Sequence, residues 1–355
     1  MAEPHALPVA VGPRVTADEI VFALPDPGHR LAGVRLAHEL NLPGLPVEFG
    51  FDEAAGAWTL TIPRPPVRRM EYRLELRHPD GGTENGTDPT NPVRTPGAFG
   101  DKSVLTMPGY TAPAWLAGAP PWPAGAPLAI RTGVGPVEVT VLSPDRPARH
   151  LLLAHDGPEF DRLGALGRFA ATMVRDGRLP PFHLVLAAPG SRDARYSANP
   201  AYATALATVV LPRLHAALGS TGPAVLIGAS LGALAALHAQ RRYPNTVGGL
   251  FLQSGSFFVP EHDECERNYR YYPRVTRYVA TVRHAGPGPA VPVTLTCGAV
   301  EENANNNRLM ADILRRQGYP ATLHEVPDAH NYVAWRDALD PHLTGLLARV
   351  WAADA

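Results

Sequence analysis

Apolar and polar residues alternate over short stretches in the first third of the chain. Residues 58–62 read WTLTI, with apolar positions separated by threonine, and residues 72–77 read YRLELR, with apolar positions separated by charges. A period of two in β-forming residues is typical of strands that bury one face. The turn-forming sequence HPDGG follows the second stretch, and no helical pattern interrupts the region. Residues 17–107 are therefore predicted to form a small all-β sandwich.

The pattern changes from about residue 128 onward. Short apolar runs of the kind found in buried strands alternate there with helix-like stretches: VEVTVLS, HLLLAHDG, FHLVLAAPG, AVLIG, GLFLQSG, VTLTC and TLHEV. After VTLTC, five residues share one face at helical spacing and a cap glycine follows them: Leu309, Met310, Ile313, Leu314, Gln317 and then Gly318. Residues 128–355 are therefore predicted to form an α/β domain with a doubly wound, mostly parallel sheet.

A stretch rich in proline, glycine and alanine separates the two regions. Residues 111–127 read TAPAWLAGAPPWPAGAP, a composition that disfavours both a strand ladder and a helix. We predict an inter-domain linker at 108–127 and an N-terminal tail at 1–16.

Composition narrows the class of protein. The 355 residues are 45% hydrophobic, enough for sizeable cores, and 32 basic residues against 33 acidic ones give a net charge of −1. That balance offers no electrostatic reason to expect nucleic acid or an anionic membrane as partner. Two cysteines, no secretory signal and no apolar run of bilayer length favour a cytoplasmic protein. The sequence does not indicate an oligomeric state.

One serine lies between two glycines where a strand pattern gives way to a helix pattern. Residues 225–239 read VLIGASLGALAALHA, so Ser230 falls on the predicted turn, flanked by Gly228 and Gly232. A turn this sharp leaves no room for flanking side chains, and it holds a hydroxyl at the carboxyl edge of the sheet. We predict that Ser230 is a nucleophile and that the Leu231 N–H, at the helix start, helps to stabilise an oxyanion.

A serine nucleophile needs a base and a group that orients the base. In an α/β-hydrolase fold these follow the serine in the order acid, then histidine. Of 14 histidines, His330 lies in a loop, DAHNYVAW, between the last strand pattern and a closing helix. The loop TCGAVEEN offers two acids, of which Glu301 is favoured over Glu302. Asp328 is interpreted as a turn former because it is too close to His330 in sequence.

These motifs resemble the putative-esterase family typified by enterochelin esterase, which also includes feruloyl esterases and mycolyltransferases. The likeness is carried by LIGASLGALAALHAQRRYPNTVGGLFLQSGSFF, by DAHNYVAWRDAL and by DPTNP in the first region. The resemblance implies an α/β-hydrolase domain preceded by an immunoglobulin-like sandwich. It also implies a serine carboxylesterase with Ser230, His330 and an acid three residues after the glycine of TCGAVEEN, which is Glu301.

The resemblance also indicates where substrate binds, and one departure concerns the oxyanion site. The family takes a second oxyanion N–H from the residue after the glycine of HDG, but Pro158 stands there and has no N–H. Gly157 or Glu159 is predicted to donate instead. Predicted substrate contacts are His155, Asp156, Arg192, Arg195, Tyr196, Tyr271, Tyr272 and Trp335. No metal or other cofactor is expected, and the expected partner is a small-molecule ester.

Several other functions remain open on the sequence alone. An acyltransferase would use the same three residues but transfer the acyl group to an alcohol, and a feruloyl-type esterase would differ only in its substrate. A binding protein built on an inactive hydrolase is disfavoured because all three catalytic residue types are present. A carbohydrate-binding β domain is disfavoured because Trp58 and Tyr72 are predicted to be core residues.

Overall fold

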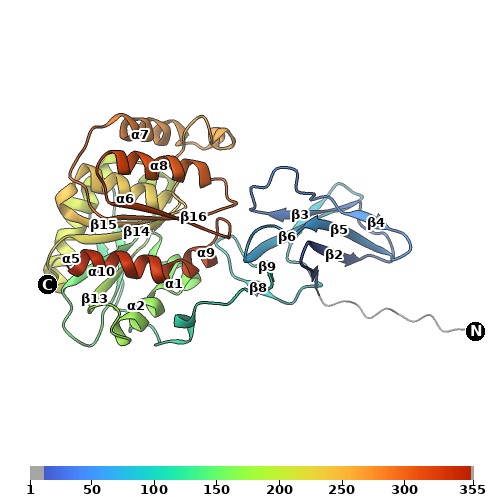
Figure 1. Cartoon of the computed structure of the whole chain (residues 1–355), viewed down its shortest axis with the longest axis horizontal. Helices are drawn as coiled ribbons and strands as arrows, with labels where there is room; N and C mark the ends of the chain where they lie inside the picture. Colours follow the sequence, from blue (N-terminus) through green and yellow to red (C-terminus); the bar gives the residue numbers. More distant parts are fainter. Residues whose placement is uncertain (1–11, 353–355) are drawn as a thin grey trace, which may run out of the picture. The chain divides into compact units, whose positions relative to one another are not determined.

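The computed structural model describes residues 12–352, which form two compact units (Figure 1). Unit 1 comprises residues 12–111 together with Pro327–Ala329, and unit 2 comprises Ala112–Val326 together with 330–352.

Unit 1 is a sandwich of two antiparallel sheets. One sheet has the order β1 (Arg14–Val15), β2 (Glu19–Pro25), β5 (Ala57–Pro63) and β4 (Gly50–Asp52). The other has the order β3 (Gly33–His38), β6 (Arg69–Arg77), β9 (Lys102–Thr106) and β8 (Arg94–Thr95), and β7 (Thr83–Gly86) pairs with β6. The predicted tail 1–16 is wrong at its end because Arg14–Val15 pairs with β2, and residues 1–11 lie outside the described part.

The alternating residues of unit 1 bury one face of each strand, as their pattern predicts. Phe22 on β2 and Tyr72 on β6 pack edge to face between the sheets, with ring centroids 5.3 Å apart. Trp58 is 7% exposed and Tyr72 is 1% exposed, so both are core residues as predicted. The hydroxyl of the buried Tyr72 donates a hydrogen bond to the carboxylate of Asp88, at 2.7 Å.

The proline-rich stretch packs against unit 2 instead of spanning freely between the units. A short 3₁₀ helix, Ala114–Ala117, places Trp115 edge-on to Phe169, with centroids 5.5 Å apart, and Trp122 packs similarly against Phe182. Trp115 is 6% exposed and belongs to the core of unit 2. The indole rings of Trp115 and Trp122 therefore attach this stretch to the core of unit 2, which its overall composition did not indicate.

We expect Trp115→Ala to destabilise unit 2 by about 3–5 kcal/mol, since it empties a buried aromatic site. Urea unfolding followed by circular dichroism measures the change. Trp122→Ala, which removes a partly buried ring, is the matched control and should cost less. Equal stability of Trp115→Ala and the parent would show that the Trp115 ring contributes little to the core of unit 2.

Unit 2 is built on one eight-stranded sheet. Its order is β10 (Leu128–Ile130), β11 (Val137–Leu142), β13 (Phe182–Ala187), β12 (His150–Ala154), β14 (Ala224–Ala229), β15 (Val247–Gln253), β16 (Val293–Gly298) and β17 (Ala321–Val326). β10, β11 and β13 pair antiparallel, and all pairs from β13 to β17 are parallel. Every strand predicted from the apolar runs is present, and the fold is the predicted α/β-hydrolase type.

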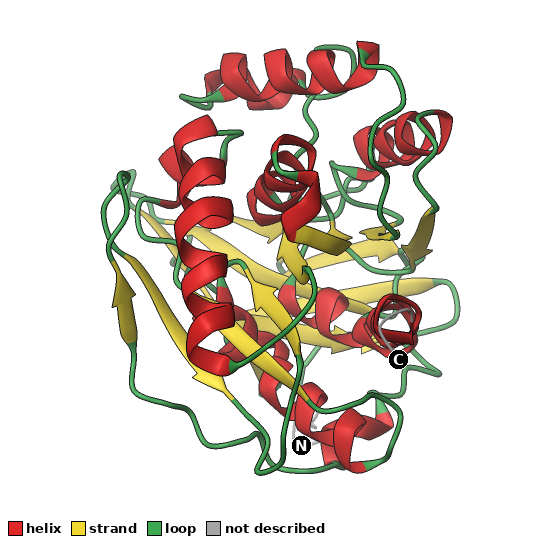
Figure 2. Ribbon diagram, turned by 90° about the vertical axis from the view of Figure 1, so that its left-hand side faces the viewer, coloured by secondary structure: helices red, strands yellow, loops and turns green. Residues whose placement is uncertain are grey.

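Helices cover both faces of this sheet (Figures 1 and 2). On one face pack α1 (Gly157–Gly164), α2 (Leu166–Arg175), α9 (Tyr332–Asp337) and α10 (Thr344–Ala352). On the other pack α4 (Pro200–Ala205), α5 (Leu211–Leu218), α6 (Leu231–Arg242), α7 (Tyr272–His284) and α8 (Ala304–Arg316). The predicted end of α8 is confirmed, because Gly318 follows it with φ +86°.

The strand order places a topological switch beside β12. β13 lies on one side of β12 and β14 on the other, so the chain leaving the carboxyl ends of β12 and β14 diverges toward opposite sheet faces. Open α/β sheets bind ligands at such a point. The predicted nucleophile turn follows β14 directly.

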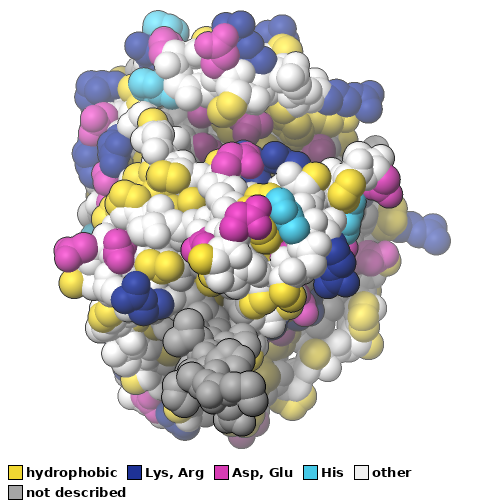
Figure 3. Space-filling view, turned by 90° about the vertical axis from the view of Figure 1, so that its right-hand side faces the viewer, with side chains coloured by type: hydrophobic (Ala, Val, Ile, Leu, Met, Phe, Trp, Pro, Cys, Tyr) yellow, Lys and Arg dark blue, Asp and Glu magenta, His cyan; other side chains and the backbone are white. Residues whose placement is uncertain are grey.

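Two predictions from the overall composition, one about charge and one about membrane-spanning segments, can be compared with the described residues. On the face shown in Figure 3, basic and acidic side chains are interspersed outside the grey atoms, in keeping with the near-zero net charge. One helical run, Pro200–Leu218, is long and apolar enough to cross a membrane, with a mean hydropathy of 1.2. Its side chains Tyr202, Leu206 and Val210 belong to the core of unit 2, which accounts for that apolar character.

Candidate active site

Ser230 lies on a strained turn between β14 and α6. Its backbone has φ +55° and ψ −123°, a conformation that a residue other than glycine adopts only where the surroundings enforce it. The turn is tight: a Cβ on Gly228 would lie 2.4 Å from the backbone carbon and oxygen of Gly232. The strain aims the hydroxyl out from the carboxyl edge of the sheet, as a nucleophile elbow requires.

We expect Gly228→Ala to open this turn. The added methyl group has no space, so the substitution should cost about 1–3 kcal/mol or more of stability and lower ester hydrolysis at least about 100-fold. Thermal unfolding and hydrolysis of a p-nitrophenyl ester measure the two effects. Gly345→Ala is the control, because nothing lies within 4 Å of the added Cβ there. Full activity of Gly228→Ala would show that the turn tolerates a side chain.

Glu301 and His330 are brought together from the loops after β16 and β17. Glu301 Oε1 lies 3.3 Å from His330 Nδ1, and the carboxylate is 1% exposed. Of the two predicted acids, the structure thus places Glu301 against the imidazole. Glu302 is exposed and lines the cavity in front of Ser230.

Three further donors hold the Glu301 carboxylate. Cys297 Sγ lies 3.1 Å from Oε1, and Ser254 Oγ and the Gly298 N–H donate to Oε2 at 2.8 and 2.9 Å. Burial alone would raise the pKa of Glu301, but the charge of His330 and these hydrogen bonds outweigh it and lower the pKa. Glu301 is therefore ionised at neutral pH and can stabilise a protonated imidazole.

A buried tryptophan connects the acid and the base. Trp335 Nε1 donates to Ser254 Oγ at 2.9 Å, and its ring packs edge-on to His330 with centroids 5.0 Å apart. Trp335 is 7% exposed. The sequence predicted a substrate contact for Trp335, and the structure instead places it among the groups that fix His330 and Glu301.

Backbone hydrogen bonds tie the ends of adjacent strands together around the site. The Ser230 N–H donates to the Gln253 carbonyl at 2.9 Å, and the Ser254 N–H donates to the Thr296 carbonyl at 2.7 Å. The turns after β14 and β15 are thus fixed to the neighbouring strands β15 and β16. Ser230, Glu301 and His330 follow β14, β16 and β17 at one edge of the sheet, although up to 100 residues separate them along the chain.

A small cavity opens in front of Ser230. It measures about 130 Å³ and is lined by Ser230, Leu231, Ser256, Phe258, Glu266, Tyr269, Glu302 and Asn303. Ser256 Oγ lies 3.0 Å from Ser230 Oγ. The sequence did not single out Ser256 or Ser254, although both stand in QSGS directly after a predicted strand.

The predicted oxyanion donors lie at two helix N-termini. Leu231 is the first residue of α6 and Gly157 is the first residue of α1, which follows β12 beside β14. First-turn N–H groups have no acceptor within their own helix, so Leu231, Gly157 and Glu159 can each direct an N–H outward. At Gly157 no other residue fits, because a Cβ would lie 2.3 Å from Leu186 Cα.

An ion pair holds the polar loop, residues 188–199, which connects β13 to α4 and contains α3 (Arg192–Tyr196). Arg192, on α3, donates to both oxygens of Asp156 at 2.8–3.0 Å. Asp156 is 4% exposed and has φ +52° just before Gly157. The pair therefore fixes the turn that carries Gly157, and Arg192 remains partly exposed beside it.

Three other predicted substrate contacts are buried. Arg195 donates to the carbonyls of Val134 and Pro136, at 3.1 and 2.8 Å, and it supports the backbone there. Tyr196 and His155 are 0% exposed and pack against each other, and burial lowers the pKa of His155 to about 4. The structure thus gives these residues packing roles in place of the predicted substrate contacts.

Of the tyrosines after β15, Tyr269 lines the cavity, whereas Tyr271 and Tyr272 are not among its lining residues. Tyr271 is contacted by Arg270 and Arg274, whose guanidinium carbons lie 5.4 and 4.4 Å from its ring centroid. Tyr272 is 8% exposed and stacks on Phe258. Tyr269 is anchored instead by a 2.7 Å hydrogen bond with Ser197. The spacing of the tyrosines in the sequence does not indicate which of them lines the cavity and which packs elsewhere.

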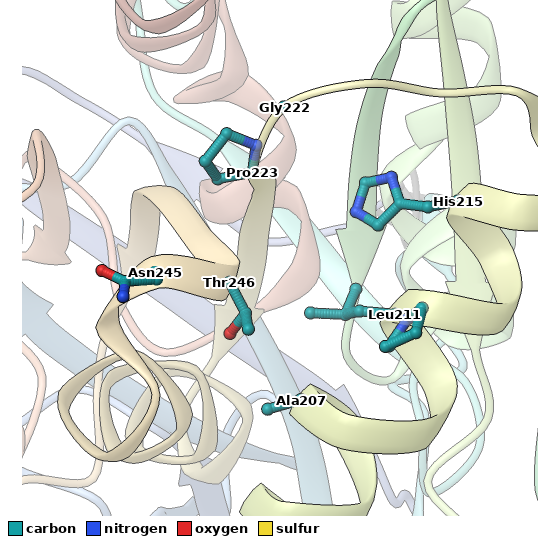
Figure 4. Close-up of a pocket in the computed structure, with 8 residues that line it drawn as sticks. Ala207, Leu211, His215, Gly222, Pro223, Asn245 and Thr246 are labelled. Carbon is teal, nitrogen blue, oxygen red and sulfur yellow. The ribbon is translucent and has the colours of Figure 1, made fainter.

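A second cavity, of about 320 Å³ and therefore larger than the one at Ser230, lies away from this site. Figure 4 shows its lining, which includes Leu211, His215 and Pro223. Pro223 precedes β14 and Thr246 precedes β15, so this cavity opens at the amino edge of the sheet, opposite to Ser230. In the part of the chain that the structure covers, no group of three or more His, Cys, Asp or Glu side chains could hold a metal ion.

This fold, with a serine on a strained strand-to-helix turn, defines an α/β-hydrolase. The chain belongs to the family described as "Putative esterase", whose model matches residues 135–346. Among curated proteins, no sequence match is found.

Solved structures share the fold over nearly the whole chain. The ferric enterobactin esterase of Salmonella typhimurium is 19% identical, with a TM-score of 0.77 over 97% of this chain and 98% of that one. The enterobactin esterase of Shigella flexneri, solved in the presence of enterobactin, is 18% identical, with a TM-score of 0.75 over 97% of each chain. A ferulic acid esterase is 16% identical, with a TM-score of 0.52 over 64% of this chain and all of its own.

Proposed function

We propose that this esterase-family protein is a serine carboxylic ester hydrolase in which Ser230, His330 and Glu301 form the catalytic triad. The observation that carries the proposal is the strained conformation of Ser230 at the mouth of a cavity, with a buried carboxylate and an imidazole paired at the same sheet edge. Strain of this kind persists only where the surrounding structure enforces it, and it clusters at catalytic sites.

The mechanism follows from the roles that these groups can take. His330 removes the proton of Ser230 as its Oγ attacks the ester carbonyl, and the ionised Glu301 stabilises the imidazolium through Nδ1. The Leu231 N–H, with an N–H from Gly157 or Glu159, stabilises the oxyanion of the tetrahedral intermediate. His330 then protonates the departing alcohol. In the second half-reaction it activates water, which releases the acid and regenerates Ser230.

The proposed substrate is a siderophore ester or another small metabolite ester. The proposal is supported by the fold shared across both units with enterobactin esterases, one of which was solved with enterobactin. A feruloyl-type ester is the alternative, supported by the shorter alignment with a ferulic acid esterase. A cytoplasmic location stays a prediction from the sequence.

A panel of esters tests this proposal. We expect the protein to hydrolyse p-nitrophenyl esters of short acyl chains, and enterobactin and methyl ferulate distinguish the two substrate classes. Added alcohol distinguishes hydrolysis from acyl transfer, because a transferase would convert most of the acyl-enzyme to the new ester instead of the free acid. Absence of turnover on every ester, with the protein folded, would contradict the proposal.

A further inference from the structure

The loop after β15 contacts both ends of the proposed triad. Ser254 Oγ donates to Glu301, and Ser256 Oγ lies 3.0 Å from the Oγ of Ser230. Ser256 is 2% exposed and lines the same cavity as Ser230. The triad itself assigns no task to this second hydroxyl, although it lies beside the reacting atom.

The position of Ser256 is fixed by backbone contacts. Its N–H donates to the carbonyl of Ser230 at 3.1 Å, so the two serines are joined by backbone as well as by side chains. The preceding residue, Gly255, is held at both polar groups by the buried amide of Asn307, which accepts from its N–H at 3.0 Å and donates to its carbonyl at 2.8 Å. The hydroxyl of Ser256 therefore meets Ser230 without needing to reorder a flexible segment.

We propose that Ser256 is a further catalytic residue, whose hydroxyl donates a hydrogen bond to Ser230 Oγ and stabilises the negative charge that develops on it during attack. The inference rests on the proposed function, because it concerns the same nucleophile. It adds a donor at the attacking oxygen itself, whereas the oxyanion site acts on the carbonyl oxygen of the substrate.

The direction of this hydrogen bond follows from the chemistry. Ser230 must give its proton to the imidazole, so in the reactive state its oxygen accepts from Ser256 and does not donate to it. As the Ser230 proton leaves, its oxygen gains charge and the bond from Ser256 becomes charge-assisted, roughly twice as strong as a neutral one. When the acyl–oxygen bond has formed, that charge has passed to the carbonyl oxygen and the bond weakens again. Ser256 keeps its own proton throughout.

The test is a graded series at position 256, measured by the rate of covalent labelling with a fluorophosphonate. Ser256→Ala removes the donor, and Ser256→Cys retains a weaker one. We expect labelling to slow about 10- to 100-fold in Ser256→Ala and by an intermediate factor in Ser256→Cys. Ester hydrolysis should lose kcat by similar factors, with KM within about threefold of the parent. Ser191→Ala, at an exposed position of the polar loop, is the matched control and should label at the parent rate.

Three results would overturn the assignment. Labelling of Ser256→Ala at the parent rate would show that the hydroxyl does not assist attack. Equal loss in the Ala and Cys variants would indicate that only its packing matters, and a change confined to KM would indicate substrate binding. Failure of the parent itself to label would overturn the proposed function and with it the role of Ser256, whereas the three results above leave the proposed function intact. Thermal unfolding of each variant identifies those that are not folded.

Discussion

Ser230→Ala is expected to lower kcat for ester hydrolysis about 10⁵-fold or more while leaving the fold intact. The methyl group cannot attack a carbonyl, and the residual rate would come only from the oxyanion site and substrate binding. Alanine fits the space of serine at this position, so the expected change in stability is small. The substitution removes the hydrogen bond with Ser256, and it keeps the backbone strain at φ +55° because alanine also carries a Cβ.

Steady-state kinetics on a p-nitrophenyl ester measure this effect, and circular dichroism confirms that the variant is folded. Ser191→Ala is the control, since Ser191 lies in the exposed loop before α3. If Ser230→Ala and the parent hydrolysed every ester at the same rate, the nucleophile would have to lie elsewhere in the chain.

Glu301→Gln is expected to produce the second-largest loss, about 10³- to 10⁴-fold in kcat. The neutral amide keeps the shape of the side chain but cannot stabilise an imidazolium, and it can favour the wrong imidazole tautomer. The loss corresponds to about 4–5.5 kcal/mol of transition-state stabilisation. The amide group also faces the Gly298 N–H, the Ser254 hydroxyl and the Cys297 thiol, which all donate to the carboxylate in the parent.

Glu302→Gln is the matched control, because it is the neighbouring acid and is exposed at the cavity. We expect its kcat to stay within about tenfold of the parent, because the structure places the carboxylate of Glu301 against the imidazole of His330. The ratio of the two kcat values is the measurement. A larger loss in Glu302→Gln than in Glu301→Gln would reverse the assignment of the acid.

The parallel strands and the turn at Ser230 could be predicted because their signals are local. Each strand is a short apolar run bounded by turn residues, and the GASLG sequence carries the steric demand of the turn within five residues. The pairing of Glu301 with His330 follows from the order of elements in this fold. Glu301 was favoured over Glu302 on the sequence, although both glutamates occupy the same loop, and the family resemblance supported the same choice.

The supporting groups could not be predicted, because their roles depend on contacts distant in sequence. Ser254 and Trp335 are 81 residues apart yet hydrogen-bonded, and nothing in either local sequence indicates the partner. Arg195 was expected to face the substrate, but its guanidinium supports backbone carbonyls about 60 residues away. The proline-rich stretch was predicted to be a linker from its composition. Composition does not show that two of its side chains, Trp115 and Trp122, pack against unit 2.

The most direct measurement is mass-spectrometric mapping of the protein after reaction with a fluorophosphonate. We expect one adduct per chain, on the peptide that contains Ser230, with labelling lost in Ser230→Ala and strongly slowed in Glu301→Gln. An adduct on another residue of the folded protein, or no adduct from a preparation that hydrolyses esters, would contradict the proposed role of Ser230.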